Sequence, residues 1–385
     1  MSLREFLEGH GVAEKDIKTA EEQGPEALQL LVIDRLLVPG DRRYTEDEVL
    51  ERAGVDRETA RKLWRAIGFP DVPEGQAVFT DTDIEALVTL KQMIDQGVVD
   101  PDVALQLTRV FGQSLSRMAD AQVGSLRNRI EQPLRQAGAS DAEIAEAVTT
   151  VAGGMLPTVE RFVQHLFRRH LAAAAQRQLF YGSEPSAGET IAVGFADLVG
   201  FTALSQQLDE RELASMVDRF ESLAYDVIAQ LSGRIVKMLG DEVMFVADEP
   251  AAGARIALRL AEAYADDETL PDVRVGLAIG PALAREGDYF GPTVNLASRI
   301  VNIAYAGSAV VSDEIHAALE ENPEFGWKPL RPRRLKGIGW TPLWVLTRPG
   351  DAGERHGIPA EVSRRMSVRR ARRRAQEEEK EAEAD

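Results

Sequence analysis

The spacing of hydrophobic residues changes near residue 188 and divides the chain into regions of different texture. Up to about residue 155, apolar residues recur at the intervals of an amphipathic helix, and few runs alternate as strands do. Thr45 and Glu48 stand at the spacing of a capping box, which marks the start of a helix. We therefore predict an all-helical domain over residues 1–155.

A helical connector is predicted to follow this domain. Phe162, Leu166, Leu171 and Leu179 would line one side of a helix around an alanine-rich middle. The run GSEPSAG, residues 182–188, is polar and contains glycine and proline, which interrupt regular structure. Residues 156–187 are therefore predicted to form a connector helix and a linker.

Strand-like and helical runs alternate from residue 188 to residue 348. In order they are ETIAVGFADL, ERELASMVDRFESLAYDVIAQL, GRIVKMLG, DEVMFVAD, PAAGARIALRLAEAYADD and DVRVGLAIGPA. This βαββαβ order predicts an α+β domain with a ferredoxin-like core, in which helices cover a sheet. Residues 349–385 contain blocks of charge and few aromatic residues, and we predict a disordered tail there.

Composition narrows the possible functions. The chain has 385 residues and no cysteine, which excludes disulfides and thiolate metal sites. Its formal net charge of −18 works against nonspecific binding to nucleic acid or anionic membranes. The first residues lack the apolar stretch of a signal peptide, and no 18-residue apolar run is present. We expect a cytoplasmic protein with no membrane partner, and nucleic acid is not expected as a partner.

Two aspartates at predicted strand ends are candidate metal ligands. Asp197 ends an apolar strand before a glycine turn, and Phe201 and Thr202 after that turn would present backbone N–H groups to a phosphate, which makes them candidate substrate-binding residues. Asp241 lies at the tip of the predicted hairpin, where aspartate is also a common turn residue. If adjacent strands bring both carboxylates to one edge of the sheet, the pair suits two divalent ions.

A second polar group lies in the run GDYFGPTVNLASR. A helix starting at Pro292 or Thr293 would place Asn295 and Arg299 four residues apart on one face, with Asp288 just before the helix. An amide and a guanidinium on one face suit a ribose and a phosphate, although polar helix residues often only face solvent.

Five motifs together resemble the class III nucleotidyl cyclases over roughly residues 188–347. They are FADLVGFT, KMLGDEVMF, RVGLAIG, GDYFGPTVNLASR and LKGIGW, in the order and spacing of that family. The resemblance implies that Asp197 and Asp241 bind two Mg²⁺ or Mn²⁺ ions per active site. It assigns Lys237 and Asp288 to the purine.

The resemblance also implies roles around the ribose and the phosphates. Asn295 would orient the ribose, Arg299 would stabilise the transition state, and Arg274 would lie on the phosphate side. Lys336 would reach the triphosphate, whereas the alternative for Arg274 and Lys336 is that they are ordinary solvated cations. The reaction implied is adenylyl cyclase chemistry, in which the ribose 3′-hydroxyl of ATP attacks the α-phosphate and pyrophosphate leaves.

Substrate and assembly follow from the same resemblance. Lysine only donates hydrogen bonds and ionised aspartate only accepts them, so Lys237 and Asp288 fit adenine and favour ATP over GTP. In the family, one subunit supplies the two aspartates, and its partner supplies the residues matching Lys237, Asp288, Asn295 and Arg299. This chain carries both sets, so a homodimer with two complete sites is expected.

The N-terminal half resembles the helical regulatory domain of actinobacterial class III cyclases. Residues 1–155 would then restrain or release the catalytic dimer, and His165 and His170 in the connector suggest a response to pH, unless they are simply exposed. The alternative is a nucleotide sensor or a DNA-binding regulator, because residues 44–68 also resemble a helix-turn-helix with Gly54 in its turn.

Overall fold

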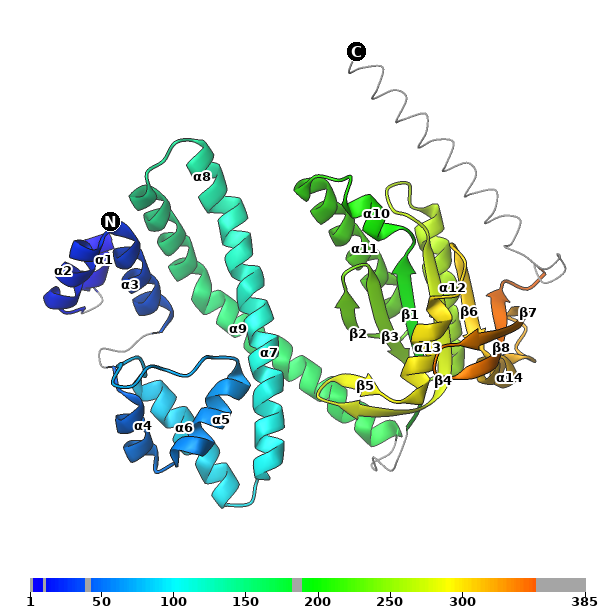
Figure 1. The fold of residues 1–385 in the computed structure, drawn as a ribbon, viewed down its shortest axis with the longest axis horizontal. Helices are drawn as coiled ribbons and strands as arrows, with labels where there is room; N and C mark the ends of the chain where they lie inside the picture. The colour runs from blue at the N-terminus through cyan, green and yellow to red at the C-terminus, as the bar shows by residue number, and fades with distance from the viewer. Residues whose placement is uncertain (1–2, 10–11, 39–42, 182–188, 351–385) are drawn as a thin grey trace, which may run out of the picture. The chain divides into compact units, whose positions relative to one another are not determined.

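The computed structural model describes residues 3–9, 12–38, 43–181 and 189–350 (Figure 1). The chain divides into two compact units, Met1–Ser183 and Glu184–Asp385, which are described separately. Residues 182–188 at the predicted linker and residues 351–385 of the predicted tail lie outside the described residues. Within those residues, no helix has both the length and the apolar character needed to cross a membrane.

The first unit is helical, as predicted. Its helices are α1 (Leu3–Gly9), α2 (Glu14–Gln23), α3 (Pro25–Leu37), α4 (Glu46–Ala53), α5 (Arg57–Ile67), α6 (Asp81–Asp95), α7 (Pro101–Leu126), the π-helix η1 (Arg127–Glu131), α8 (Gln132–Gln136) and α9 (Asp141–Tyr181).

Local capping explains several of the boundaries in this unit. The Thr45 hydroxyl accepts from the Glu48 backbone N–H, and the Glu48 carboxylate accepts from the Thr45 backbone N–H at 2.9 Å, so the capping box is confirmed. Gly54 ends α4 in the left-handed conformation, with φ of 63°, before α5 begins.

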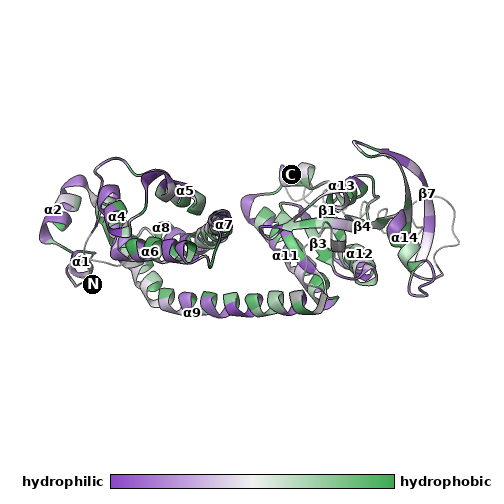
Figure 2. Ribbon diagram, turned by 90° about the horizontal axis from the view of Figure 1, so that it is seen from below, coloured by the Kyte–Doolittle hydropathy of each residue, from purple (hydrophilic) through white to green (hydrophobic). Residues whose placement is uncertain are grey.

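The helix α9 contains the predicted connector and extends beyond it towards the N-terminus. It runs for 41 residues with Pro157 inside it, so the expected boundary at residue 155 falls within one continuous helix. Figure 2 shows hydrophobic and hydrophilic residues alternating along its length. Phe162, Leu171 and Leu179 are all exposed in this unit.

The second unit has the predicted βαββαβ core. Its elements are β1 (Glu189–Leu198), α10 (Phe201–Ser205), α11 (Glu210–Gln230), β2 (Arg234–Leu239), β3 (Glu242–Ala247), α12 (Pro250–Asp266), β4 (Val273–Arg285), β5 (Asp288–Phe290), α13 (Pro292–Val301), β6 (Ser308–Ser312), α14 (Asp313–Leu319), β7 (Gly326–Leu335) and β8 (Gly339–Thr347). The strand order is β2-β3-β1-β4-β6-β8-β7, and β5 pairs with β4 outside this path.

The sheet has a hydrophobic core on each face, as expected for a two-sided α+β layer. On one face α11 and α12 contribute buried residues such as Phe220, Leu260 and Tyr264. On the other face α13 packs Ala297, Ile300 and Val301 against the sheet. Figure 1 shows α13 lying across the strands.

Gly276 on β4 allows α13 to approach the sheet closely. A β-carbon at this position would lie 2.3 Å from the Val301 backbone nitrogen and 2.8 Å from the Ala297 carbonyl oxygen. The absence of a side chain at Gly276 therefore fixes the depth at which α13 sits, and α13 is the helix that carries Asn295 and Arg299.

Candidate active site

Asp197 and Asp241 lie at the same edge of the sheet. Asp197 is near the end of β1, and Asp241 occupies the β2–β3 turn after Gly240, whose φ is 68°. The Leu198 backbone N–H donates to the Asp241 carbonyl oxygen at 3.0 Å, which joins the end of β1 to this turn. The antiparallel pairing of two strands distant in sequence thus places the two candidate metal ligands close together.

Arg274 on β4 pairs directly with Asp197. The two residues stand opposite each other in the β1–β4 register, and Arg274 donates from Nε and Nη2 to Asp197 Oδ2 at 2.6 and 2.5 Å. The Asp197 side chain is only 13% exposed, so this contact partly compensates a buried charge. The sequence placed Arg274 on the phosphate side, and the structure adds this carboxylate partner.

Glu242 is a third carboxylate at this edge that the sequence reading did not single out. It stands opposite Asp197 in the β1–β3 register. Burial, followed by the charges of Asp197 and Asp241, raises the pKa of Glu242 to about 7. Burial also raises the pKa of Asp197, although the hydrogen bonds from Arg274 oppose that rise. The negative charge of these clustered carboxylates is therefore energetically costly unless a cation balances it.

This charge and its chemistry fit a hard divalent cation. Carboxylate oxygens are the ligands that Mg²⁺ and Mn²⁺ prefer. The described residues contain no group of three or more His, Asp and Glu side chains arranged to hold a metal ion by themselves. Asp197 and Asp241 would therefore leave coordination positions for water and for nucleotide phosphates.

Lys237 and Asp288 form a second charged pair. Lys237 lies on β2 and Asp288 begins β5, and their side chains make an ion pair in which each is about one-third or less exposed. The Tyr289 backbone N–H also donates to Asp288 Oδ1 at 2.8 Å, which fixes the carboxylate. Among the described residues, no hydrogen bond or ion pair links this pair to Asp197 or Arg274.

The remaining candidate residues lie at the surface. Asn295 and Arg299 are exposed on α13 in the expected helical spacing, and Lys336 is exposed in the β7–β8 turn. Within the described part of the chain, these three side chains make no hydrogen bond or ion pair. Phe201 and Thr202 begin α10 after Gly200, whose φ is 81°. Within one chain, therefore, no hydrogen bond or ion pair among the described residues joins Asn295, Arg299 or Lys336 to Asp197 or Asp241.

Two family models match the chain. An adenylate cyclase regulatory domain matches residues 1–174, and an adenylate and guanylate cyclase catalytic domain matches residues 184–348. An adenylate cyclase from Streptomyces coelicolor is 36% identical over 360 residues, which cover 86% of this chain and 92% of that protein. The chain belongs to the class III adenylate cyclase family.

Two other relatives are similar to this cyclase over most of its length. An adenylate cyclase from Glutamicibacter nicotianae is 37% identical over 352 residues, covering 87% of this chain and 85% of that protein. A protein of Mycobacterium tuberculosis named as a pH-sensitive adenylate cyclase is 31% identical over 347 residues, covering 87% and 84%.

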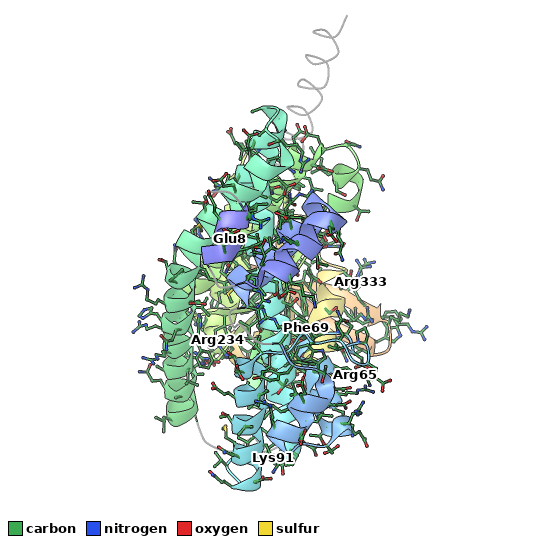
Figure 3. All side chains as sticks on the ribbon, turned by 90° about the vertical axis from the view of Figure 1, so that its left-hand side faces the viewer. Glu8, Arg65, Phe69, Lys91, Arg234 and Arg333 are labelled. Carbon is green, nitrogen blue, oxygen red and sulfur yellow. The ribbon has the colours of Figure 1, made fainter. Side chains whose placement is uncertain are left out.

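The segment that resembles a helix-turn-helix comprises α4 and α5, and acidic side chains compensate the basic side chains of α5. DNA binding relies on lysine and arginine side chains that neutralise phosphates. The basic residues of α5 instead pair with nearby carboxylates, and Arg65 is labelled in Figure 3. The pairs are Arg57 with Glu46 and Asp47, Arg61 with Glu46, Lys62 with Glu58, and Arg65 with Asp71.

Proposed function

We propose that this cyclase converts ATP to 3′,5′-cyclic AMP and pyrophosphate at active sites shared between two copies of the chain. The observation that carries the proposal is the division of the candidate groups within one chain. Asp197 and Asp241 meet at one edge of the sheet, whereas Asn295 and Arg299 are exposed on α13. A symmetric dimer would join the aspartates of one copy to the helix of the other.

Asp197 and Asp241 would hold two Mg²⁺ or Mn²⁺ ions. When bound, such ions supply Lewis acidity that favours ionisation of the ribose 3′-hydroxyl and offsets charge on the leaving pyrophosphate. Arg274 forms an ion pair with Asp197. Once bound metal ions neutralise this carboxylate, Arg274 would turn towards the phosphates. Phe201 and Thr202 would offer backbone N–H groups to the phosphates after the glycine turn.

The partner copy would supply the groups on α13. Arg299 would meet the negative charge that grows on the α-phosphate oxygens, where a fixed cation in a site that excludes water is most effective. Asn295, one helical turn earlier, would hold the ribose so that its 3′-hydroxyl faces the phosphorus. Lys336 would reach the triphosphate from the β7–β8 turn.

The Lys237–Asp288 pair would select adenine. Adenine presents an acceptor at N1 and a donor at N6, which match the donating ammonium and the accepting carboxylate. Guanine presents a donor at N1 and an acceptor at O6, so each group would face the wrong partner. We therefore infer a preference for ATP over GTP.

Residues 1–155 would regulate the catalytic unit, and the predicted connector helix over residues 156–182 would transmit their state. The match of residues 1–174 to a regulatory domain and the name of the mycobacterial relative support this role and a response to pH. His165 and His170 are exposed on α9 and are the candidates for the pH response. If replacing both with alanine leaves the pH–activity profile unchanged, these histidines are not the sensor.

Cyclic nucleotide formation by the purified full-length chain tests the proposal. With Mn²⁺, ATP should yield cyclic AMP and GTP should react more slowly, and Asp241→Ala should abolish both activities. A chain that begins at Glu189 should react faster if the N-terminal unit is inhibitory. If neither the full-length chain nor the chain that begins at Glu189 makes cyclic AMP, although each is folded and dimeric, the proposal is refuted.

A further inference from the structure

A second polar contact connects β2 to β5 beside the Lys237–Asp288 pair. Arg234, labelled in Figure 3, donates from Nη1 to the Tyr289 hydroxyl oxygen at 3.1 Å and from Nη2 to Asp248 Oδ1 at 2.6 Å. Arg234 and Asp248 are each about one-third exposed, so these bonds are partly shielded from water. The guanidinium thus joins the end of β3 to β5.

A β-bulge puts Arg234 and Lys237 on the same face of the sheet. Residues three apart on a regular strand point to opposite faces. Here the β2–β3 register shifts between Ile235 and Lys237, so Arg234 stands opposite Val246 and Lys237 opposite Met244. The extra residue in β2 therefore allows both cations to reach β5.

The strand β5 has few other attachments. It is three residues long and pairs with β4 at the far end of a hairpin whose Leu283 and Phe290 are exposed. Among the described residues, the side-chain hydrogen bonds and ion pairs between β2 and β5 are Lys237 with Asp288 and Arg234 with Tyr289. If Lys237 and Asp288 turn to a purine, the contact between Arg234 and Tyr289 remains to hold β5 in place.

Selection between the two purines requires a fixed position for both base-reading groups. Adenine needs the donor at position 1 and the acceptor at position 6, and guanine needs the reverse. Positions 1 and 6 are neighbouring atoms on one edge of the base, so a small shift of β5 relative to β2 would move Asp288 away from the adenine N6 amino group while Lys237 stays at N1, and the pair of hydrogen bonds that distinguishes adenine from guanine would be lost. The ATP preference therefore depends on the spacing of the two strands as well as on residue type.

We propose that Arg234 and Tyr289 are positioning residues that set purine selectivity by fixing β5 against β2. The proposal rests on the base-reading role of Lys237 and Asp288 given above. Neither residue needs to contact the nucleotide, because each acts through the placement of Asp288 relative to Lys237.

Tyr289→Phe is the direct test in the full-length chain. It removes the hydroxyl that accepts from Arg234 and keeps the ring, which packs against the core on the α13 face. We expect the ratio of kcat/KM for ATP to that for GTP to fall about tenfold, the usual scale for losing a hydrogen bond to a charged group. The fall should come mainly from a higher KM for ATP, with kcat less affected.

Tyr305→Phe is a matched control, because the Tyr305 hydroxyl accepts from Arg333 at 3.2 Å elsewhere in the same unit. It should leave the ATP/GTP ratio unchanged. Arg234→Gln should lower the ATP/GTP ratio. Arg234→Lys keeps a positive charge beside Asp248 and should lower the ratio less than Arg234→Gln does. Arg234→Gln combined with Tyr289→Phe should match Arg234→Gln alone, because both changes break the same contact.

Lys237→Met and Asp288→Asn distinguish a failure of the positioning role from a failure of the base-reading role. If these variants change the ratio but Tyr289→Phe and Arg234→Gln, with wild-type melting temperatures, do not, the positioning role is wrong and the base-reading role stands. If Lys237→Met and Asp288→Asn leave the ratio unchanged, the base-reading role fails. A Tyr289→Phe effect that adds fully to that of Arg234→Gln would also overturn the proposal.

Discussion

Mixing two inactive variants would reveal whether the active site is shared between subunits. Asp241→Ala removes a proposed metal ligand, and Arg299→Ala removes the exposed arginine on α13. Each homodimer should be inactive, because both of its sites lack one group. In a mixed dimer, one site combines the two alterations, whereas the other combines the intact Asp241 of one copy with the intact Arg299 of the other.

The expected recovery follows from symmetry. If the two chains are present in equal amounts and exchange subunits freely, half of the dimers are mixed. Each mixed dimer has one intact site out of two. Cyclic AMP formation should therefore reach about one quarter of the wild-type rate at equal total protein. If Asp241 and Arg299 acted within a single chain, no dimer would contain a complete site, and the mixture would stay inactive.

The assay is cyclic AMP formation from ATP with Mn²⁺, after co-expression of the two chains with different affinity tags. Asp241→Ala mixed with Asp197→Ala is the matched control, because both alterations affect the proposed metal-binding edge and every site in the mixed dimer stays incomplete. Recovery in this control would refute the reasoning. So would an inactive Asp241→Ala and Arg299→Ala mixture in which pull-down demonstrates mixed dimers.

Three other predictions concern the electrostatics and packing of the same unit. The pKa of Glu242 is raised to about 7, so the folded chain binds the Glu242 carboxyl proton more tightly than the unfolded chain does. The stability that this proton contributes is fully present below the ordinary pKa of 4.5 and is lost as the pH rises through 7. The free energy of unfolding of metal-free protein should thus fall by about 1 kcal/mol between pH 5 and pH 8, after allowance for solvent screening, and urea titration should find no such fall in Glu242→Gln. Gly276→Ala should lower the free energy of unfolding, measured by urea titration, by about 2 kcal/mol and reduce cyclic AMP formation, because the added β-carbon would push α13 away. Gly154→Ala is the control: it has open space around it in α9 and should not destabilise the chain. Thr45→Ala should lower the free energy of unfolding of the N-terminal unit by about 1 kcal/mol, measured by urea titration of the helical signal, and an unchanged value would mean that the capping box adds nothing.

The sequence predicted secondary structure correctly where the period of hydrophobic residues and the positions of turn residues agree. The βαββαβ core and the capping box at Thr45 follow from such local patterns, and the structure confirms them. The strands β5 and β7 were not anticipated. β5 has only three residues, and β7 contains Pro329, Pro332 and several basic residues, which strand propensity disfavours.

Contacts between distant strands could not be predicted from the sequence. Arg274 and Asp197 are 77 residues apart, and their pairing depends on the β1–β4 register. The raised pKa of Glu242 likewise depends on the approach of two strands and a turn. Motif position gave candidate residues, but the charges that surround each one come from tertiary structure.

The composition of β7 has a consequence for association between chains. This strand forms one end of the sheet, and Figure 2 shows it as largely hydrophilic. Pro329 and Pro332 have no backbone N–H to donate, and Arg331 and Arg334 add repelling charge. These residues therefore disfavour addition of a strand from a second chain, so this edge resists fibre-like aggregation and leaves other surfaces for the proposed dimer.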